Sequence, residues 1–133
     1  MRIGELADEV GVDPKTIRYY ESIALLPEPP RTAAGYRHYG PEDVERLAFV
    51  RRATELDLRL DEIREILALR DRGVRPCDYV LEVARQRITE LDQRIVQMRQ
   101  ARNELERLLA RTPSAEQAGR YCELIEHRTS NGA

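Results

Sequence analysis

The sequence predicts a mainly α-helical chain, with a winged helix-turn-helix at its N-terminal end and one long helix after it. Three observations lead to this fold class. Apolar residues recur at helical spacing between glycine and proline breaks over the first 75 residues, a proline-rich stretch separates the second helical segment from the third, and residues 77–111 contain neither glycine nor proline. Of the 133 residues, 41% are hydrophobic and 5% aromatic, which favours a core of aliphatic side chains on amphipathic helices.

The first two helices follow from cap and spacing signals. One apolar face is formed by residues spaced i, i+3, i+4 and i+7, namely Ile3, Leu6, Ala7 and Val10. Gly11 ends this helix, and a second begins at once because Asp13 suits an N-cap and Pro14 the first helical position. A helix, a tight glycine turn and a second helix form the helix-turn-helix outline.

The second helix has two different faces. At about 100° per residue, Tyr20 lies beside Ile17 and is expected to pack inward. Lys15, Arg18 and Tyr19 cluster on the opposite side, where cations and an aromatic ring can meet a phosphate backbone or base edges.

A small β-hairpin is predicted within the stretch "LLPEPPRTAAGYRHYG". Pro27, Pro29 and Pro30 exclude a helix there, and "AAG" separates the short segments "RT" and "YRHY". Beside a helix-turn-helix, this hairpin would be a wing carrying four side chains that can reach a nucleic-acid backbone, Arg31, Tyr36, Arg37 and Tyr39.

Two more helices complete the N-terminal unit. The third opens at Pro41 and the fourth ends at Gly73. This unit, residues 1–75, is expected to bind DNA.

Residues 76–112 are predicted to form the long helix. Its apolar residues follow a heptad pattern, at Leu81, Ala84, Ile88, Leu91, Ile95, Met98, Leu105 and Leu109, with Arg102 as the one interruption. Since such a helix would be roughly 50 Å long, another chain must cover its apolar stripe, which predicts a coiled-coil homodimer. Residues 113–133 are expected to form a loop, a short helix and a polar tail.

Charge and composition limit the function. The formal net charge of −2 argues against indiscriminate polyanion binding, but residues 14–40 carry four basic side chains against two acidic ones. No segment has the length of a membrane span or the apolar core of a signal peptide, so a cytoplasmic protein without membrane contact is expected. A phosphate-binding loop, an HExxH pair and a nucleophile with a base are all missing, which disfavours an enzyme.

The sequence resembles the MerR family of bacterial transcription regulators. The matching stretches are "MRIGELADEVGV", "KTIRYYE", "LLPEPPRTAAGYRHYG", "LDEIREIL" and "RPCDYV", in this order and covering nearly the whole chain. The resemblance implies a homodimer that binds two half-sites of double-stranded promoter DNA. The effector state of this dimer changes the twist and bend of the DNA, so that RNA polymerase can use a promoter with an overlong spacer. It places the DNA contacts on Lys15, Thr16, Arg18 and Tyr19 of the second helix and on Arg31, Tyr36 and Arg37 of the wing. Alternatively, Arg18 is a solvated charge and Tyr36 fills the core of the wing.

The two cysteines resemble those of the family's regulators for thiophilic metals. Cys77 matches the cysteine at the start of the long helix, and Cys122 is similar to the last cysteine of the following loop. Antiparallel pairing of the long helices would bring Cys77 of one subunit beside Cys122 of the other. Metal-sensing relatives usually carry a further cysteine where this chain has "RTPSAEQ". Two thiolates suit linear Hg(II) or Cu(I), whereas Zn(II) would need extra donors such as His127, Glu116, Glu123 or water. Cd(II) is a further thiophilic candidate.

These observations favour a regulator that distorts promoter DNA in response to a thiophilic metal and controls metal resistance or efflux genes. One alternative is a regulator of the same fold that responds to oxidation of Cys77 and Cys122 to an intersubunit disulfide, or to an organic effector. Another is a coiled-coil interaction protein that does not bind DNA. For single residues, the cysteines can be ordinary buried side chains and His127 a solvated tail residue.

Overall fold

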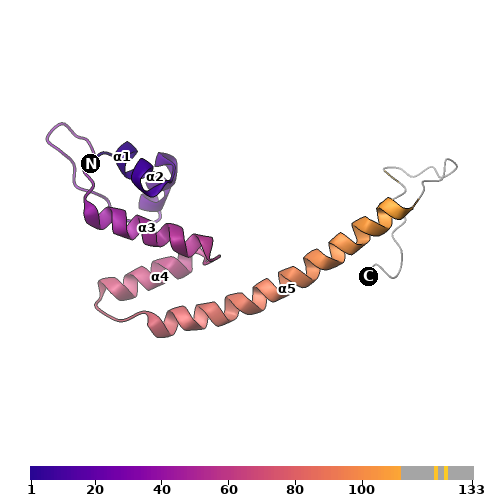
Figure 1. Ribbon diagram of the computed structural model, residues 1–133. Coiled ribbons are helices and arrows are strands. Elements are labelled where there is room, and N and C mark those ends of the chain that lie inside the picture. The colour runs from indigo at the N-terminus through magenta and orange to yellow at the C-terminus, as the bar shows by residue number, and fades with distance from the viewer. Residues whose placement is uncertain (112–121, 123–124, 126–133) are drawn as a thin grey trace. The chain divides into compact units, whose positions relative to one another are not determined.

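The computed structural model describes residues 1–111, 122 and 125, and the chain divides into two compact units, Met1–Arg87 and Ile88–Ala133. The described helices are α1 (Ile3–Val10), α2 (Pro14–Ser22), α3 (Pro41–Glu55), α4 (Leu60–Asp71) and α5 (Cys77–Ala110) (Figure 1). The mainly helical fold predicted from the sequence is therefore confirmed.

Helices α1 and α2 form the predicted helix-turn-helix. Gly11 ends α1 in the left-handed conformation, with φ at +81°, and its N–H donates to the carbonyl oxygen of Ala7 over 2.8 Å. The Asp13 carboxylate accepts the Lys15 backbone N–H at 2.8 Å, so α2 begins with the expected cap. Arg51 of α3 donates to the carbonyl oxygen of Val10, which ties α3 to the end of α1.

Two groups of buried apolar side chains hold α1 to α4 together. The first joins α1, α2 and α3 through Leu6, Ala7, Val10, Ile17, Leu26, Tyr39 and Leu47. The second lies between α3 and α4 and consists of Leu25, Val50, Ala53, Ile63 and Leu67. Tyr20 packs against both groups, which confirms that its side chain points inward.

The segment between α2 and α3 reverses direction where the wing was predicted, but regular strands are not present among its described residues. A single antiparallel bridge joins Arg31 and Arg37, and the Thr32 N–H donates to the Tyr36 carbonyl oxygen at 2.7 Å. Three prolines remove backbone donors from the first arm, which limits the ladder. The second arm is held instead by the chain start, because the Met1 ammonium group donates to the Tyr39 carbonyl oxygen at 2.7 Å and the Tyr39 N–H donates back to Met1 at 2.8 Å.

Helices α3 and α4 are joined by a short turn and by a charged pair at the far end of α4. Arg46 donates to both carboxylate oxygens of Asp71, at 3.0 and 3.1 Å. This two-point contact lowers the pKa of Asp71 below its ordinary range.

Helix α5 begins one residue later and ends two residues earlier than the range 76–112 expected from the sequence. In the single chain, the heptad positions Leu81, Ile88, Ile95, Met98, Leu105 and Leu109 are exposed. Among the described residues, no helix has both the length and the apolar character needed to cross a membrane.

Candidate DNA-binding surface and thiol site

The outer face of α2 presents the side chains that the sequence places there. Lys15 and Arg18 are exposed, Thr16 is half-buried, and Tyr19 exposes 53% of its surface. The ring of Tyr20 lies 6.1 Å from that of Tyr19 on the inward side, and burial raises the pKa of Tyr20. The two adjacent tyrosines therefore differ in environment: one packs in the core and the other stands beside two cations.

Tyr36, on the loop between α2 and α3, is exposed and contacts a cation. The Arg2 guanidinium lies 4.1 Å from the centre of the Tyr36 ring, a cation–π distance, and Tyr36 is about half exposed. Tyr36 is therefore not a core residue of the wing. Arg31 lies in the same loop, and its side chain donates to the Gly35 carbonyl oxygen at 2.9 Å. The position of Arg2 was not predicted, since a single arginine before α1 carries no sequence signal for contact with residue 36.

Arg37 has a structural contact that the sequence did not predict. Its Nε lies 3.4 Å from Oε1 of Glu21 on α2, and the Glu21 side chain is almost fully buried. The Tyr39 hydroxyl donates to the other carboxylate oxygen of Glu21 at 3.0 Å. Burial and then this hydrogen bond raise the pKa of Tyr39 well above its usual range. Glu21 thus fixes the loop to α2, and part of the charge of Arg37 is neutralised.

Cys77 and Cys122 are both exposed free thiols in the chain. Cys77 opens α5 and belongs to the first unit, whereas Cys122 belongs to the second, where its carbonyl oxygen accepts the Ile125 N–H at 3.0 Å. Exposure argues against the alternative of two cysteines buried in the core of their own chain. In the part of the chain that the structure describes, no three metal-binding side chains gather, and His127, Glu116 and Glu123 lie outside the described residues.

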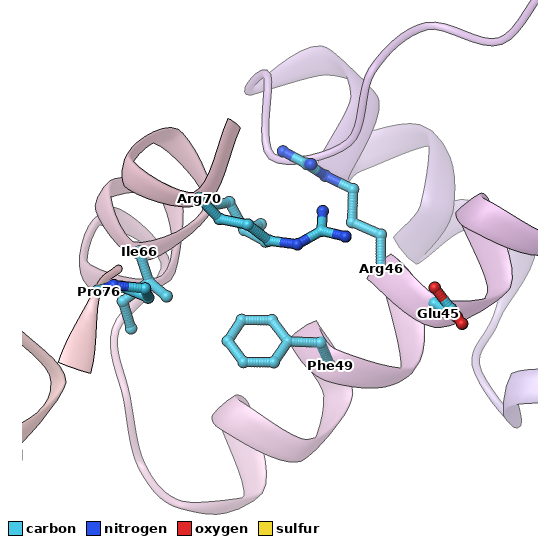
Figure 2. A pocket seen from close by; sticks show the side chains of 7 residues that line it. Glu45, Arg46, Phe49, Ile66, Arg70 and Pro76 are labelled. Atoms are coloured by element: carbon cyan, nitrogen blue, oxygen red, sulfur yellow. The ribbon is translucent and has the colours of Figure 1, made fainter. Parts of the chain in front are cut away.

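An apolar hollow of about 170 Å³ lies between α3 and α4 (Figure 2). The Phe49 ring faces it from α3, with Ile66 and Arg70 of α4 and Pro76 around it. Sites for organic ligands usually enclose about 300–1,000 Å³. The hollow is therefore small for an organic effector.

Comparison with known proteins identifies the family. The family model described as "MerR HTH family regulatory protein" matches residues 1–70, and that described as "MerR, DNA binding" matches residues 44–108. The chain is 40% identical over 112 residues to the mercuric resistance operon regulatory protein of Bacillus cereus, covering 84% of this chain and 85% of that protein. It is 43% identical over 109 residues to the heavy metal-dependent transcription regulator 2 of Rhizobium meliloti, covering 81% and 74%.

A solved structure agrees with these relatives. The crystal structure of the transcription regulator PbrR691 from Ralstonia metallidurans CH34 in complex with lead(II) is 36% identical, covers 96% of this chain and 98% of its own, and superposes with a TM-score of 0.77. The helix-turn-helix has an exposed cationic face, and the relatives of this chain regulate transcription. These features define the class of protein as a DNA-binding transcriptional regulator and not an enzyme. The chain belongs to the MerR family.

Proposed function

We propose that this protein is a metal-responsive regulator, which as a homodimer distorts promoter DNA when a thiophilic metal binds and thereby controls metal resistance or efflux genes. The observation that carries the proposal is the exposed Cys77 at the start of α5. The chain is similar to regulators whose names specify mercuric resistance and heavy metals, and to a regulator solved in complex with lead(II). In this proposal residues 1–75 bind DNA, residues 76–112 form the dimer, and residues 113–133 take part in effector binding.

The DNA contacts are assigned to Lys15, Thr16, Arg18 and Tyr19 of α2 and to Arg31, Tyr36 and Arg37 of the loop that serves as the wing. The exposure of Lys15, Arg18 and Tyr19 supports this assignment. Arg37 is expected to contribute less to the salt dependence of binding than Arg31, because Glu21 lies 3.4 Å from its guanidinium.

The homodimer is assigned to the apolar stripe of α5. Six of its heptad residues are exposed by 45–88% in the single chain. Leaving so many large apolar side chains in water is unfavourable, and pairing them in an antiparallel coiled coil would remove them from it. Antiparallel pairing also places the start of one helix beside the end of its partner.

The metal is assigned to Cys77 of one subunit and Cys122 of the other, with His127 as a further candidate donor. Two thiolates are soft ligands that suit Hg(II) and Cu(I), while Zn(II), Cd(II) or Pb(II) would draw on additional donors. RNA polymerase is the expected partner at the promoter, because a change in DNA twist and bend would alter whether the polymerase can use that promoter.

Metal titration of the reduced protein tests the proposal. Hg(II), Cu(I), Cd(II), Zn(II) and Pb(II) are added separately while thiolate-to-metal charge-transfer absorption is recorded, and each loaded protein is then bound to a selected DNA duplex with a fluorescent base analogue at its centre. We expect about one metal per subunit and a metal-dependent change in base fluorescence, both abolished by Cys77→Ser. Metal binding by neither wild type nor variant would contradict the proposal. A dimer cross-linked by oxidant through Cys77 and Cys122, with an accompanying change in base fluorescence, would favour the thiol-oxidation alternative.

A further inference from the structure

Three charged side chains meet at the place where the first turns of α5 join the rest of the first unit. Arg87 of α5 is only 3% exposed and donates through Nη2 to Oε1 of Glu62, which is 8% exposed and lies in the first turn of α4. Arg87 Nε lies 3.9 Å from Oδ2 of Asp57, in the turn between α3 and α4. Because desolvation offsets much of the attraction in a buried ion pair, added stability does not by itself account for such a group.

Both acidic residues that Arg87 contacts also take part in the connection between α3 and α4, Glu62 through its carboxylate and Asp57 through its backbone. Oε1 of Glu62 accepts the Arg59 backbone N–H at 2.8 Å and so caps α4. Asp57 has a left-handed backbone, with φ at +66°, and its N–H donates to the Thr54 carbonyl oxygen at 3.0 Å, where α3 ends. A single guanidinium on α5 therefore contacts both ends of this connection.

Neighbouring residues extend the contact along the same face of α5. Tyr79 and Val83 precede Arg87 by two turns and one turn, and Val83 is 5% exposed. Partial burial, and then the carboxylates of Glu62, Glu65 and Asp61 at the start of α4, raise the pKa of Tyr79. The first turns of α5 thus pack on the beginning of α4, all within the unit Met1–Arg87.

We propose that Arg87 is a positioning residue that couples α5 to the DNA-binding helices, by holding the start of α4 and the α3–α4 turn against α5. From there α4 contacts α3, α3 contacts α1, and α1 contacts α2, so packed elements connect Arg87 to the face assigned to DNA. The inference rests on the proposed function, since it requires that this protein binds DNA through α2. Coupling between two sites is reciprocal, so DNA binding at α2 must also change the conformational equilibrium of α5.

A paired substitution isolates this role. Glu62→Gln combined with Arg87→Met removes both buried charges together, while the glutamine oxygen can still accept the Arg59 N–H and methionine replaces most of the arginine stem. The matched control is Glu82→Gln combined with Arg85→Met. This pair lies on the same helix, is exposed, and has its charged atoms 3.5 Å apart.

The measurement is amide hydrogen exchange of the full chain with and without DNA. The probe is a duplex selected by the wild-type protein from a random pool, so no metal is required. In wild type and in the control we expect DNA to slow exchange about tenfold both in α1–α2 and in residues 80–90 of α5, within the usual range of coupling between sites. In the Glu62→Gln, Arg87→Met protein, protection of α1–α2 should remain and that of residues 80–90 should fall to less than about threefold.

Equal DNA-induced protection of α5 in this variant and in wild type would overturn the inference. Loss of protection in α1–α2 as well would make Arg87 a structural residue and would also overturn it. If the paired variant does not fold, Arg87→Lys decides: its ammonium keeps a buried charge beside Glu62 but cannot span both carboxylates as the guanidinium does, so intermediate protection of α5 is expected and full protection contradicts the coupling. Failure of the wild type to select any duplex would refute the proposed function itself, and the inference with it.

Discussion

Replacing Gly11 with alanine tests the geometry of the turn between α1 and α2. Gly11 has a φ of +81°, which alanine adopts only with strain. A Cβ atom added there would also lie 2.6 Å from Nη1 of Arg51, the group that donates to the carbonyl oxygen of Val10. The substitution therefore strains the backbone and displaces the arginine that holds α3 to the end of α1.

The magnitude follows from these two effects. The left-handed conformation costs alanine about 1–2 kcal/mol. Losing a hydrogen bond from a charged donor costs about 1.5–3 kcal/mol, and the lower end applies because the Arg51 side chain is half exposed and water can replace it. We expect Gly11→Ala to lower the free energy of unfolding by about 2.5–3.5 kcal/mol.

Urea unfolding at fixed protein concentration measures this loss, with Gly4→Ala as the control. Gly4 lies within α1, and a Cβ there would meet no atom within 4 Å, so alanine should stabilise the protein by about 0.5–1 kcal/mol. In an Arg51→Ala background the cost of Gly11→Ala should shrink to the backbone strain alone, about 1–2 kcal/mol. A loss below about 1 kcal/mol, or the same loss in both backgrounds, would refute this explanation of the turn.

Three further predictions concern the surfaces of the molecule. Leu105→Glu, on the exposed heptad stripe, should shift the protein from dimer to monomer in sedimentation experiments, whereas Val96→Glu, exposed but off the stripe, should leave the dimer intact; monomer in both or neither would contradict the assigned interface. Lys15→Ala should weaken operator binding and reduce the slope of log affinity against log salt by about 1, and an unchanged slope would remove Lys15 from the phosphate contacts. The hydrogen bonds from Arg46 lower the pKa of Asp71, so the ionised Asp71 side chain stabilises the folded protein at neutral pH. This contribution to the free energy of unfolding is lost as the pH falls through the lowered pKa. Asp71→Asn should therefore lower the free energy of unfolding by less than about 1 kcal/mol at pH 7 and by progressively less on acidification, and a cost that grows on acidification would contradict the assignment.

The helix ends could be predicted because local signals determine them. Gly11 must end α1, the Asp13–Pro14 pair starts α2, and the absence of helix breakers after Cys77 allows one long helix, and the structure confirms all three. The expected hairpin was only partly correct, because the prolines that exclude a helix also remove ladder donors and leave one bridge.

Contacts between distant charges could not be predicted in the same way. Arg87 and Glu62 look like solvated charges on two amphipathic helices, and only the packing of α5 on α4 makes them a buried pair. Likewise, the pairing of Arg37 with Glu21 depends on how the loop folds back on α2. The DNA contacts and the shared thiol site remain predictions, since each depends on a second molecule.

The most direct test of the central claim, a metal site shared between subunits, is metal binding by a mixed dimer. One subunit carries Cys77→Ser and the other Cys122→Ser, each with a different affinity tag, and the purified mixed dimer is titrated with Hg(II) beside the two mutant homodimers and wild type. If each site takes Cys77 from one subunit and Cys122 from the other, the mixed dimer keeps one intact site. It should then bind half as much metal as wild type while both mutant homodimers bind none with comparable affinity. A mixed dimer that binds no metal, while wild type binds it, would contradict the shared site.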